Sequence, residues 1–461
     1  MKLTVLGGGG VRIPALVRAV VGDRPTPFDR IDLFEPDQLR RTTIGRLASA
    51  AATALGYPDV VNVTDDVEQA LTGADYVFSA IRVGGDDARI VDERLALKHG
   101  LVGQETTGPG GCAMALRTIP VVLSYCEVIS RVAPHAVLIN FTNPAGIITQ
   151  AVTTNSNVRA LGVCDTPSGA QARLAGFLGI DADRIAFSYG GLNHLGWITS
   201  AIIDGEERID ELLTRYDELK EFNSRFAGFD TGLVRKIGAI PTEYLYYFYD
   251  SQACARSVSR SGTTRGENVR RFNEQLITSV AKAFETGDVN DAWAAYSQVM
   301  GARHDSYMRL DIGKTKASDG PQAGTPDRLD APAGQIGGYS GVALRVIDGL
   351  SGAAPAPVIV NTRNGRSLDF LDPEDVVEVP ALIDTRGVSP LATQPLPGQA
   401  RGLVQQVKEY ERAVVEAAVT GELETATLAL AMNPLVPGVT AARELMEEYL
   451  EHHGPYLEYL Q

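Results

Sequence analysis

Short apolar runs alternate with longer amphipathic stretches through the first third of the chain. The runs occupy residues 3–6, 31–34, 60–63, 76–81, 136–141 and 160–164. Alternation of strand-like and helical patterns is typical of βαβ units, in which parallel strands form a sheet with helices on both faces. The pattern therefore predicts an α/β fold with a Rossmann-like, doubly wound parallel sheet, whose first domain spans residues 1–167.

The pattern changes near residue 185. Residues rich in β-formers fill positions 185–203, and Asp204-Gly205 offers a compact turn that favours antiparallel pairing. Further helical patterns lie at 210–223, 233–248, 269–284, 291–299, 342–350, 401–419, 423–432 and 439–452, with one more strand at 358–361. Residues 168–461 are therefore predicted to form a mixed α+β domain that completes a site above the carboxyl edge of the sheet.

Residues 311–341 are rich in Gly, Pro and Asp and show no periodicity. Long segments of this kind inside a compact protein are often functional loops. We therefore expect a mobile loop or lid at this place.

Composition and charge narrow the class of protein. The chain has 461 residues, of which 44% are hydrophobic, and a formal net charge of −15. Such an acidic chain is a poor partner for nucleic acid or an anionic membrane, although a local basic pocket can still bind a small phosphate. Four cysteines, Cys112, Cys126, Cys164 and Cys254, are too few for a disulfide framework in a chain of this length.

The start of the chain does not have the pattern of a secretory signal, because Arg12 and Arg18 interrupt its apolar residues. We find no segment that approaches the ~20 apolar residues of a membrane helix. Together with the sparse cysteines, these features predict a soluble cytoplasmic protein with reduced thiols.

Four glycines, Gly7 to Gly10, follow the first predicted strand. Glycines here allow a tight turn and let the backbone approach a pyrophosphate at a helix N-terminus. The third glycine of the usual six-residue motif is missing, so a purely structural glycine turn is an alternative. Glu35 at the end of the second strand supports nucleotide binding, because an acid there bonds the adenosine ribose and favours NAD over NADP.

A thiol and an imidazole lie where strand-like runs end in turns. Cys164 stands in Gly-Val-Cys-Asp-Thr-Pro and His194 in Gly-Leu-Asn-His-Leu-Gly-Trp. A Cys and a His so placed can share one divalent metal and leave coordination positions open. Taken singly, Cys164 is more often a small buried hydrophobe and His194 a core histidine.

Other candidate residues have ordinary alternatives. Asp165 suits acid catalysis, or the cap of a helix before Pro167. Tyr244 belongs to a run of aromatic residues at helical spacing, which is usually core. Asn143, in Asn-Phe-Thr-Asn-Pro, offers an amide that could orient hydroxyls, or a turn.

Four arginines, Arg82, Arg89, Arg94 and Arg265, are candidate anion ligands, although most arginines are surface residues. Arg265 is the strongest candidate, because Thr-Thr-Arg-Gly combines hydroxyls, a guanidinium and a flexible glycine suited to phosphate.

Taken together, these segments resemble glycoside hydrolase family 4, the NAD- and metal-dependent glycosidases, and most of all its 6-phospho-β-glucosidases. The resemblance extends over essentially the whole chain. Its blocks are Arg-Val-Gly-Gly at 82–85, the long run at 92–111, Asn-Phe-Thr-Asn-Pro at 140–144, Val-Asn-Thr at 360–362, Asn-Pro-Leu at 433–435 and the two metal motifs.

The resemblance implies redox chemistry in place of the paired carboxylates of most glycosidases. NAD+ takes hydride from C3 of the sugar, a divalent metal, usually Mn2+, polarises the ketone, and a tyrosine removes the acidified C2 proton. The C1 substituent leaves, water adds and the cofactor returns its hydride. The implied substrates are 6-phospho-β-glucosides, such as cellobiose 6-phosphate or an aryl glucoside 6-phosphate.

The resemblance also assigns roles by position. Cys164 and His194 match the metal ligands and Tyr244 matches the base. Sugar-phosphate contacts match Arg89, Asn143 and Arg265, with Arg265 assigned to the 6-phosphate, and the cofactor region contains Gly7, Gly8, Gly9, Glu35 and Arg82. Residues 168–461 then hold the substrate, the metal and the contacts of a homodimer or homotetramer.

One position departs from the β-specific pattern. Many β-specific relatives have Asn after the metal-binding Cys, whereas this chain has Asp165, which resembles the leaving-group acid of the α-specific branch. The longer match over residues 82–111 favours the β assignment.

Three alternatives stay open. The substrate could be an α-linked or unphosphorylated glycoside, and loss of Arg265 would then harm the neutral substrate less. A 2-hydroxy-acid dehydrogenase shares the nucleotide fold but would accumulate NADH. A non-catalytic NAD-binding module would bind nucleotide without turnover, which the set Cys164, His194 and Tyr244 argues against.

Overall fold

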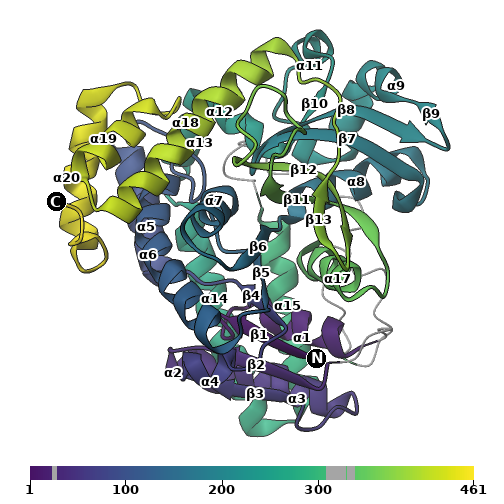
Figure 1. The fold of residues 1–461 in the computed structure, drawn as a ribbon, viewed down its shortest axis with the longest axis vertical. Helices are drawn as coiled ribbons and strands as arrows, with labels where there is room; N and C mark the ends of the chain where they lie inside the picture. The colour runs from purple at the N-terminus through teal and green to yellow at the C-terminus, as the bar shows by residue number, and fades with distance from the viewer. Residues whose placement is uncertain (23–27, 308–328, 330–337) are drawn as a thin grey trace.

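The computed structural model describes residues 1–22, 28–307, 329 and 338–461 (Figure 1). Within them, the main sheet has nine strands in the order β13-β12-β11-β6-β5-β4-β1-β2-β3. Six of these strands are parallel: β1 (Lys2–Leu6), β2 (Arg30–Phe34), β3 (Val61–Thr64), β4 (Tyr76–Ser79), β5 (Val137–Asn140) and β6 (Arg159–Gly162). The order 3-2-1-4-5-6 is that of doubly wound nucleotide-binding sheets, so the predicted Rossmann-like fold is confirmed.

Three C-terminal strands extend the same sheet in antiparallel fashion. They are β11 (Ala356–Arg363), which meets β6 where Asn361 pairs with Gly162, then β12 (Val376–Asp384) and β13 (Gly387–Pro390). The sequence predicted only the centre of β11. The sheet therefore continues across the predicted domain boundary at residue 167.

A second, antiparallel sheet covers the carboxyl edge of the first. It contains β7 (Ile185–Leu192), β8 (Leu195–Ile203), β9 (Glu206–Glu207) and β10 (Ile240–Pro241). The predicted turn at Asp204-Gly205 joins β8 to β9, as expected. Only two residues, Asn193 and His194, join β7 to β8.

The helices of the N-terminal half flank the parallel strands. They are α1 (Ile13–Val21), α2 (Gln38–Arg40), the π-helical η1 (Arg41–Gly45), α3 (Arg46–Ala54), α4 (Val67–Leu71), α5 (Gly85–Lys98), α6 (Pro109–Val132), α7 (Ala145–Asn155) and α8 (Asp165–Leu178). Along β4 the side chains alternate, so that Val77 faces α6 and α7 whereas Tyr76 and Phe78 belong to the core beneath α1 and α17. The sheet is thus covered on both faces, and its carboxyl edge is left for a site.

The C-terminal half is mostly helical (Figure 1, teal to yellow). Its helices are η2 (Ala182–Arg184), α9 (Ile209–Thr214), α10 (Tyr216–Phe222), η3 (Ser224–Phe226), α11 (Thr231–Ile237), η4 (Glu243–Leu245), α12 (Tyr246–Tyr249), α13 (Ser251–Ser261), α14 (Arg265–Thr286), α15 (Val289–Asp305), α17 (Gly338–Ser351), α18 (Gly398–Thr420), α19 (Leu423–Met432) and α20 (Val439–Leu457). The predicted loop at 311–341 lies outside the described residues, apart from 329 and the first turn of α17.

The single helix predicted over residues 233–248 is wrong. Gly238 ends α11 with a φ of +74°, a left-handed conformation that glycine adopts without penalty. Strand β10 and the short helices η4 and α12 follow. The aromatic run that suggested a long helix is therefore placed on a bend beside the second sheet.

The expectation that no segment approaches a membrane helix is also wrong, because the 24 residues of α6 are long and apolar enough by length and composition. Most of α6 is buried against α5, α7 and α18. Arg117 in its middle is buried and paired with both oxygens of Asp92 on α5, at 2.9 and 2.6 Å. These contacts identify α6 as a core helix of the fold.

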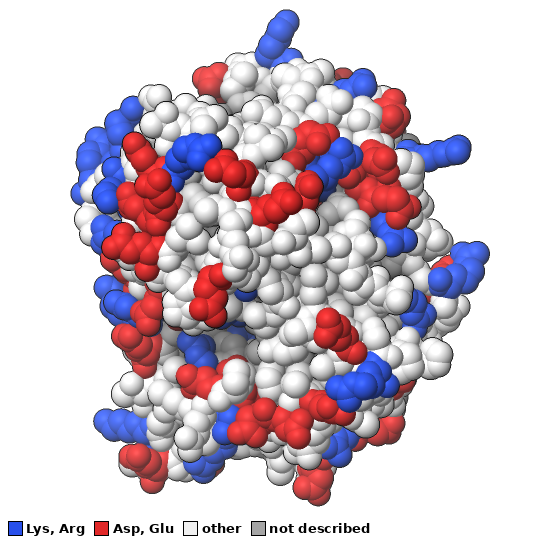
Figure 2. Space-filling model, turned by 60° about the vertical axis from the view of Figure 1, so that its left-hand side comes forward, with Lys and Arg blue, Asp and Glu red and all other residues white. Residues whose placement is uncertain are grey.

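The charged residues are mixed over the surface. Figure 2 shows acidic and basic side chains interspersed on one face, with no extended basic area among the described residues drawn there. All four cysteines are buried, and no disulfide joins any two of them, as predicted.

Candidate active site

The glycine loop folds back onto the end of β2. The backbone N–H groups of Gly7 and Gly8 both donate to the carbonyl of Phe34, and the N–H of Gly9 donates to Oε2 of Glu35 at 2.9 Å. Gly7 has a φ of +86°, and a Cβ on Gly9 would lie 2.6 Å from that of Arg40. The predicted cofactor residues Gly7, Gly8, Gly9 and Glu35 are therefore brought together at the carboxyl ends of β1 and β2.

Cys164 and His194 face each other across the edge of the main sheet. Cys164 follows β6 and caps α8, and its Sγ lies 3.5 Å from Nε2 of His194 in the β7–β8 turn. Nδ1 of His194 is hydrogen-bonded to Oγ1 of Thr106 at 2.8 Å. This second bond orients the ring so that Nε2 points at the thiol, as in many metal-ligating histidines.

The backbone of His194 has a φ of +62°. Residues other than glycine are uncommon in this left-handed region, and such strain concentrates at functional sites. A two-residue turn in this conformation brings the imidazole over the sheet edge.

The protonation of both side chains suits a cation. Burial lowers the pKa of His194 to about 4, so the imidazole is neutral. Burial, and then the carboxylates of Glu378 and Asp165, raise the pKa of the Cys164 thiol well above its usual 9. A thiolate at this position therefore requires a positive charge next to it.

The spacing of the two donors also fits a metal. Bonds of about 2.3 Å to sulfur and about 2.1 Å to nitrogen at a tetrahedral angle place the two donors about 3.6 Å apart, close to the observed 3.5 Å. Within the described part of the chain, no third His, Cys, Asp or Glu completes a metal cluster with them. The residues therefore fit a divalent ion whose other positions are filled by substrate oxygens or water.

Tyr244 lies directly against the imidazole. Its ring stacks on His194 with centroids 3.6 Å apart and an interplanar angle of 1°. The hydroxyl of Tyr307 donates to the Tyr244 oxygen at 2.8 Å, and the Tyr307 ring lies beneath the guanidinium of Arg225. Burial, and then Tyr307, raise the pKa of Tyr244 well above its usual 10, so Tyr244 becomes a base only when a cation is held beside it.

Asp165 is paired with Arg12, whose Nη1 lies 3.2 Å from Oδ2 of the carboxylate. Burial alone would raise its pKa, but the charges of Arg12 and Arg225 lower it below the usual value. A general acid requires a raised pKa, so the ligand-free protein holds Asp165 as a carboxylate. Its predicted role as an acid stays a prediction.

Arg82 and Arg89 converge on one carboxylate. Both form ion pairs with Glu105, Arg89 at 2.9 Å, and Arg89 also pairs with Glu93. Burial alone would raise the pKa of Glu105, but Arg82 and Arg89 lower it to about 2. The predicted cofactor residue Arg82 and the predicted substrate residue Arg89 are thus neighbours.

The other predicted anion ligands are placed differently. Arg265 begins α14, and its guanidinium donates to Oγ of Ser306 at 2.7 Å and to the carbonyl of Arg303 at 3.3 Å. Asn143 is half-buried between β5 and α7, without a side-chain hydrogen bond to another described residue. Arg94 has the ordinary alternative role, because it lies on the surface and is paired with Glu267.

Glu378, a buried carboxylate on β12, was not predicted from the sequence. It accepts hydrogen bonds from Tyr189 at 2.6 Å, Asn193 at 3.0 Å and Asn361 at 3.1 Å. Asn193 precedes His194 in the turn between β7 and β8. Its hydrogen bond to Glu378 therefore links this turn to β12 of the main sheet. Burial raises the pKa of Glu378 to about 7. No local motif marks this residue, which stands among apolar positions of an unpredicted strand.

Glu378 makes stability depend on pH. Because its pKa is about 7 in the folded protein and 4.5 in an unfolded chain, the folded protein binds the extra proton between these values. The free energy of unfolding therefore falls as pH rises from about 4.5 to about 7. In Glu378→Gln, which is neutral at every pH, this loss is absent.

The quantity to compare is the free energy of unfolding of Glu378→Gln minus that of the wild type. We expect this difference to be about 2 to 3 kcal/mol larger at about pH 8 than at about pH 5. Urea unfolding of the metal-free proteins at both pH values measures it. An equal difference at both values would contradict the prediction.

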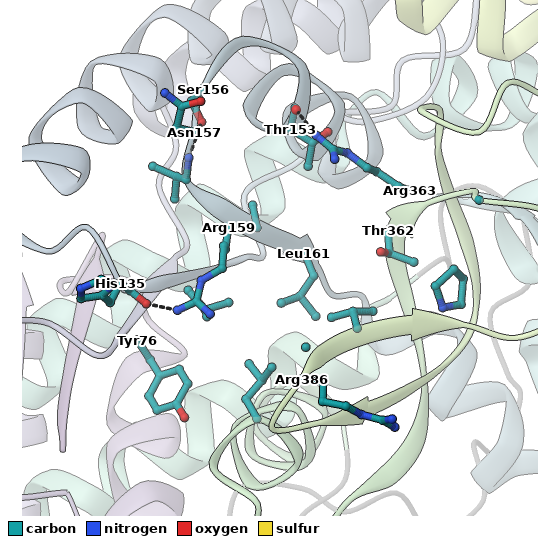
Figure 3. Close-up of a pocket in the computed structure, with 18 of the residues that line it drawn as sticks. Tyr76, His135, Thr153, Ser156, Asn157, Arg159, Leu161, Thr362, Arg363 and Arg386 are labelled. Carbon is teal, nitrogen blue, oxygen red and sulfur yellow. Dashed lines mark hydrogen bonds between the residues drawn. The ribbon is translucent and has the colours of Figure 1, made fainter.

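A pocket of about 820 Å³ lies at the opposite ends of the strands (Figure 3), beside Tyr76, the first residue of β4, and Arg159, the first of β6. Arg159 bonds the carbonyl of His135, and Arg363 bonds the carbonyl of Thr153. This pocket contains none of the predicted site residues.

Comparison with known proteins places this geometry in a family. The model for the family 4 glycosyl hydrolases matches residues 2–180, and the model for the family 4 glycosyl hydrolase C-terminal domain matches residues 189–436. A probable 6-phospho-beta-glucosidase of Bacillus subtilis is 32% identical over 99% of this chain and 97% of its own length. A 6-phospho-alpha-glucosidase of Leptotrichia buccalis is 27% identical, over 98% and 97%.

A solved structure has the same fold throughout. The 6-phospho-beta glucosidase from Thermotoga maritima, with manganese, NAD+ and glucose-6-phosphate, has a TM-score of 0.80, is 26% identical and covers 99% of each chain. Together the two family models match most of the chain, and the relatives match it over nearly its whole length. The chain therefore belongs to family 4 of the glycosyl hydrolases.

Proposed function

We propose that this protein hydrolyses 6-phospho-β-glucosides in the cytoplasm, with NAD and a divalent metal, Mn2+ by preference, as cofactors. The observation that carries the proposal is the contact of Cys164, His194 and Tyr244. Asp165, which follows Cys164, pairs with Arg12 just after the glycine loop. The Thermotoga relative, which was solved with manganese, NAD+ and glucose-6-phosphate, supports the choice of ligands. A homodimer or homotetramer is part of the same proposal.

When bound, NAD supplies a hydride acceptor and the divalent ion supplies a charge that polarises the sugar carbonyl. The protein provides the remaining parts. Gly7, Gly8, Gly9 and Glu35 bind the dinucleotide, and Thr106 keeps Nε2 of His194 directed at Cys164. The Tyr244 oxygen, once ionised beside the cation, would take the C2 proton, and the hydrogen bond of 2.8 Å from Tyr307 holds that oxygen in position.

The proposal also includes a preference for β-linked over α-linked substrates. Relatives with both linkages match over the whole chain. The pairing of Asp165 with Arg12 supports the β assignment, because it keeps ionised the residue that would serve as the acid for an α linkage.

The test compares four p-nitrophenyl substrates: the α- and β-glucosides, each with and without a 6-phosphate. We expect nitrophenol release to require NAD+ and Mn2+, without net NADH. The kcat/KM for the β 6-phosphate should exceed the other three by at least about tenfold. Faster release from the α anomer would reverse the linkage, and steady NADH production would indicate a dehydrogenase.

A further inference from the structure

Arg303 has a buried polar atom that lacks a partner. It lies in the last turn of α15, and its Nε is buried without a hydrogen bond to any residue that the structure describes. Most buried polar atoms in proteins are bonded, so an exception needs an explanation such as a bound water or ion. The Nε atoms of Arg117 and Arg173 are in the same state, and Arg303 differs from them in the charges that surround it.

The surroundings of Arg303 are strongly positive. Burial is the largest cause that lowers the pKa of Arg303, and the positive charges of four other arginines lower it further, to about 9. The four are Arg12, Arg265, Arg89 and Arg82. Like charges gathered away from water repel each other unless an anion lies between them.

The carboxylates nearby are already engaged. Glu105 pairs with Arg82 and Arg89, and Asp165 pairs with Arg12. Glu93 pairs with Arg89, and Asp86 lies 3.9 Å from Arg82. Four carboxylates therefore face five guanidinium groups, and none of the four forms an ion pair with Arg303 among the described residues. The cluster therefore has an excess of positive charge next to the catalytic residues.

Arg265 has a different part in this cluster. Its guanidinium donates to the carbonyl of Arg303 and to Oγ of Ser306, and Ser306 also donates to the Arg303 carbonyl at 2.7 Å. Arg265 therefore positions the end of α15, and with it the side chain of Arg303.

From this arrangement we infer that Arg303 contacts the 6-phosphate of the substrate and determines the preference for phosphorylated glucosides, with Arg265 as its positioning residue. The inference rests on the proposed function. A phosphate carries close to two negative charges, and a guanidinium can bind it through two N–H groups. The end of α15 also lies beside the proposed base, because Tyr307, four residues after Arg303, donates to the Tyr244 oxygen at 2.8 Å, and its ring lies 5.7 Å from the guanidinium of Arg265.

The test uses Arg303→Gln and Arg303→Lys, with Arg271→Gln as a control that removes one exposed charge on α14. For Arg303→Gln we expect KM for p-nitrophenyl-β-glucoside 6-phosphate to rise about 30- to 100-fold, with KM for the unphosphorylated glucoside unchanged. Arg303→Lys keeps the positive charge but loses the planar guanidinium that can bind a phosphate through two N–H groups. Its KM for the 6-phosphorylated glucoside should therefore lie between those of the wild type and Arg303→Gln. The control should match wild type on both substrates.

Binding measurements separate the possible failures. By calorimetry, Arg303→Gln should lose affinity for glucose 6-phosphate by the same factor, with affinity for NAD+ unchanged. Loss of NAD+ affinity instead would place Arg303 at the pyrophosphate and overturn the inference, as would an equal change for both glucosides. If the wild type prefers the 6-phosphorylated glucoside and Arg303→Gln behaves like the wild type, only the inference about Arg303 is overturned. If the wild type shows no preference for the 6-phosphorylated glucoside, the proposed function is overturned as well.

Discussion

Tyr244→Phe is expected to lower kcat on the 6-phospho-β-glucoside by about 10²- to 10⁴-fold, the usual contribution of a positioned base. The phenolic oxygen is the atom that would receive the C2 proton. Phenylalanine keeps the ring that stacks on His194 but has no oxygen to take the proton. Binding of NAD+ and of glucose 6-phosphate should therefore remain close to wild type.

Two measurements check this expectation. In D2O, wild type should incorporate deuterium at C2 of the sugar, and Tyr244→Phe should not. Hydride transfer at C3 comes before the lost step, so a signal from bound NADH should still form in a single turnover.

Two further variants serve as comparisons. Tyr307→Phe removes the hydrogen bond to Tyr244 and should have a smaller effect on kcat. Tyr459→Phe removes a hydroxyl bonded to the carbonyl of Leu116 on α6, which contacts none of the site residues named above, and should leave kcat unchanged. Deuterium incorporation by Tyr244→Phe at the wild-type rate would assign the base to another residue.

Much of the fold could be predicted from local pattern. The six parallel strands were found because each is a short apolar run between helical stretches, which is how buried strands of a doubly wound sheet read. Strand β12 was missed because Pro380 interrupts its apolar run, and proline is uncommon inside a strand. Its pairing with β11 depends on residues far away in the sequence.

The candidate site was predicted where chemistry is local. Cys164, His194 and the glycine loop each stand at the end of a strand. The glycine loop and Cys164 follow β1 and β6 of the main sheet, and His194 follows β7 of the second sheet. Tyr307, Glu378 and Arg303 have no such signal, because their roles arise from contacts with residues tens to hundreds of positions away. Their roles can be recognised only from contacts in the folded protein.

Loss of either proposed metal ligand should have the other large effect. Cys164→Ser keeps a residue suited to cap α8, and His194→Asn keeps one that tolerates the left-handed turn. Both variants are therefore expected to fold. Because two protein donors hold the ion, removal of one should lower Mn2+ affinity by more than the about 10- to 100-fold typical of a supporting residue, and activity should fall with it.

Thr106 offers a graded test of the same idea, with a matched control beside it. Thr106→Val removes the hydrogen bond that orients His194, and Mn2+ affinity should fall about 10- to 100-fold. The hydroxyl of Thr107 is buried without a hydrogen-bond partner among the described residues, so Thr107→Val should leave the affinity unchanged.

Titration followed by the Mn2+ electron paramagnetic resonance signal measures binding independently of turnover. Equal affinity in Thr106→Val, Thr107→Val and wild type would mean that His194 needs no support from Thr106 to bind the ion. Unchanged affinity in Cys164→Ser and His194→Asn as well would mean that the ion binds elsewhere.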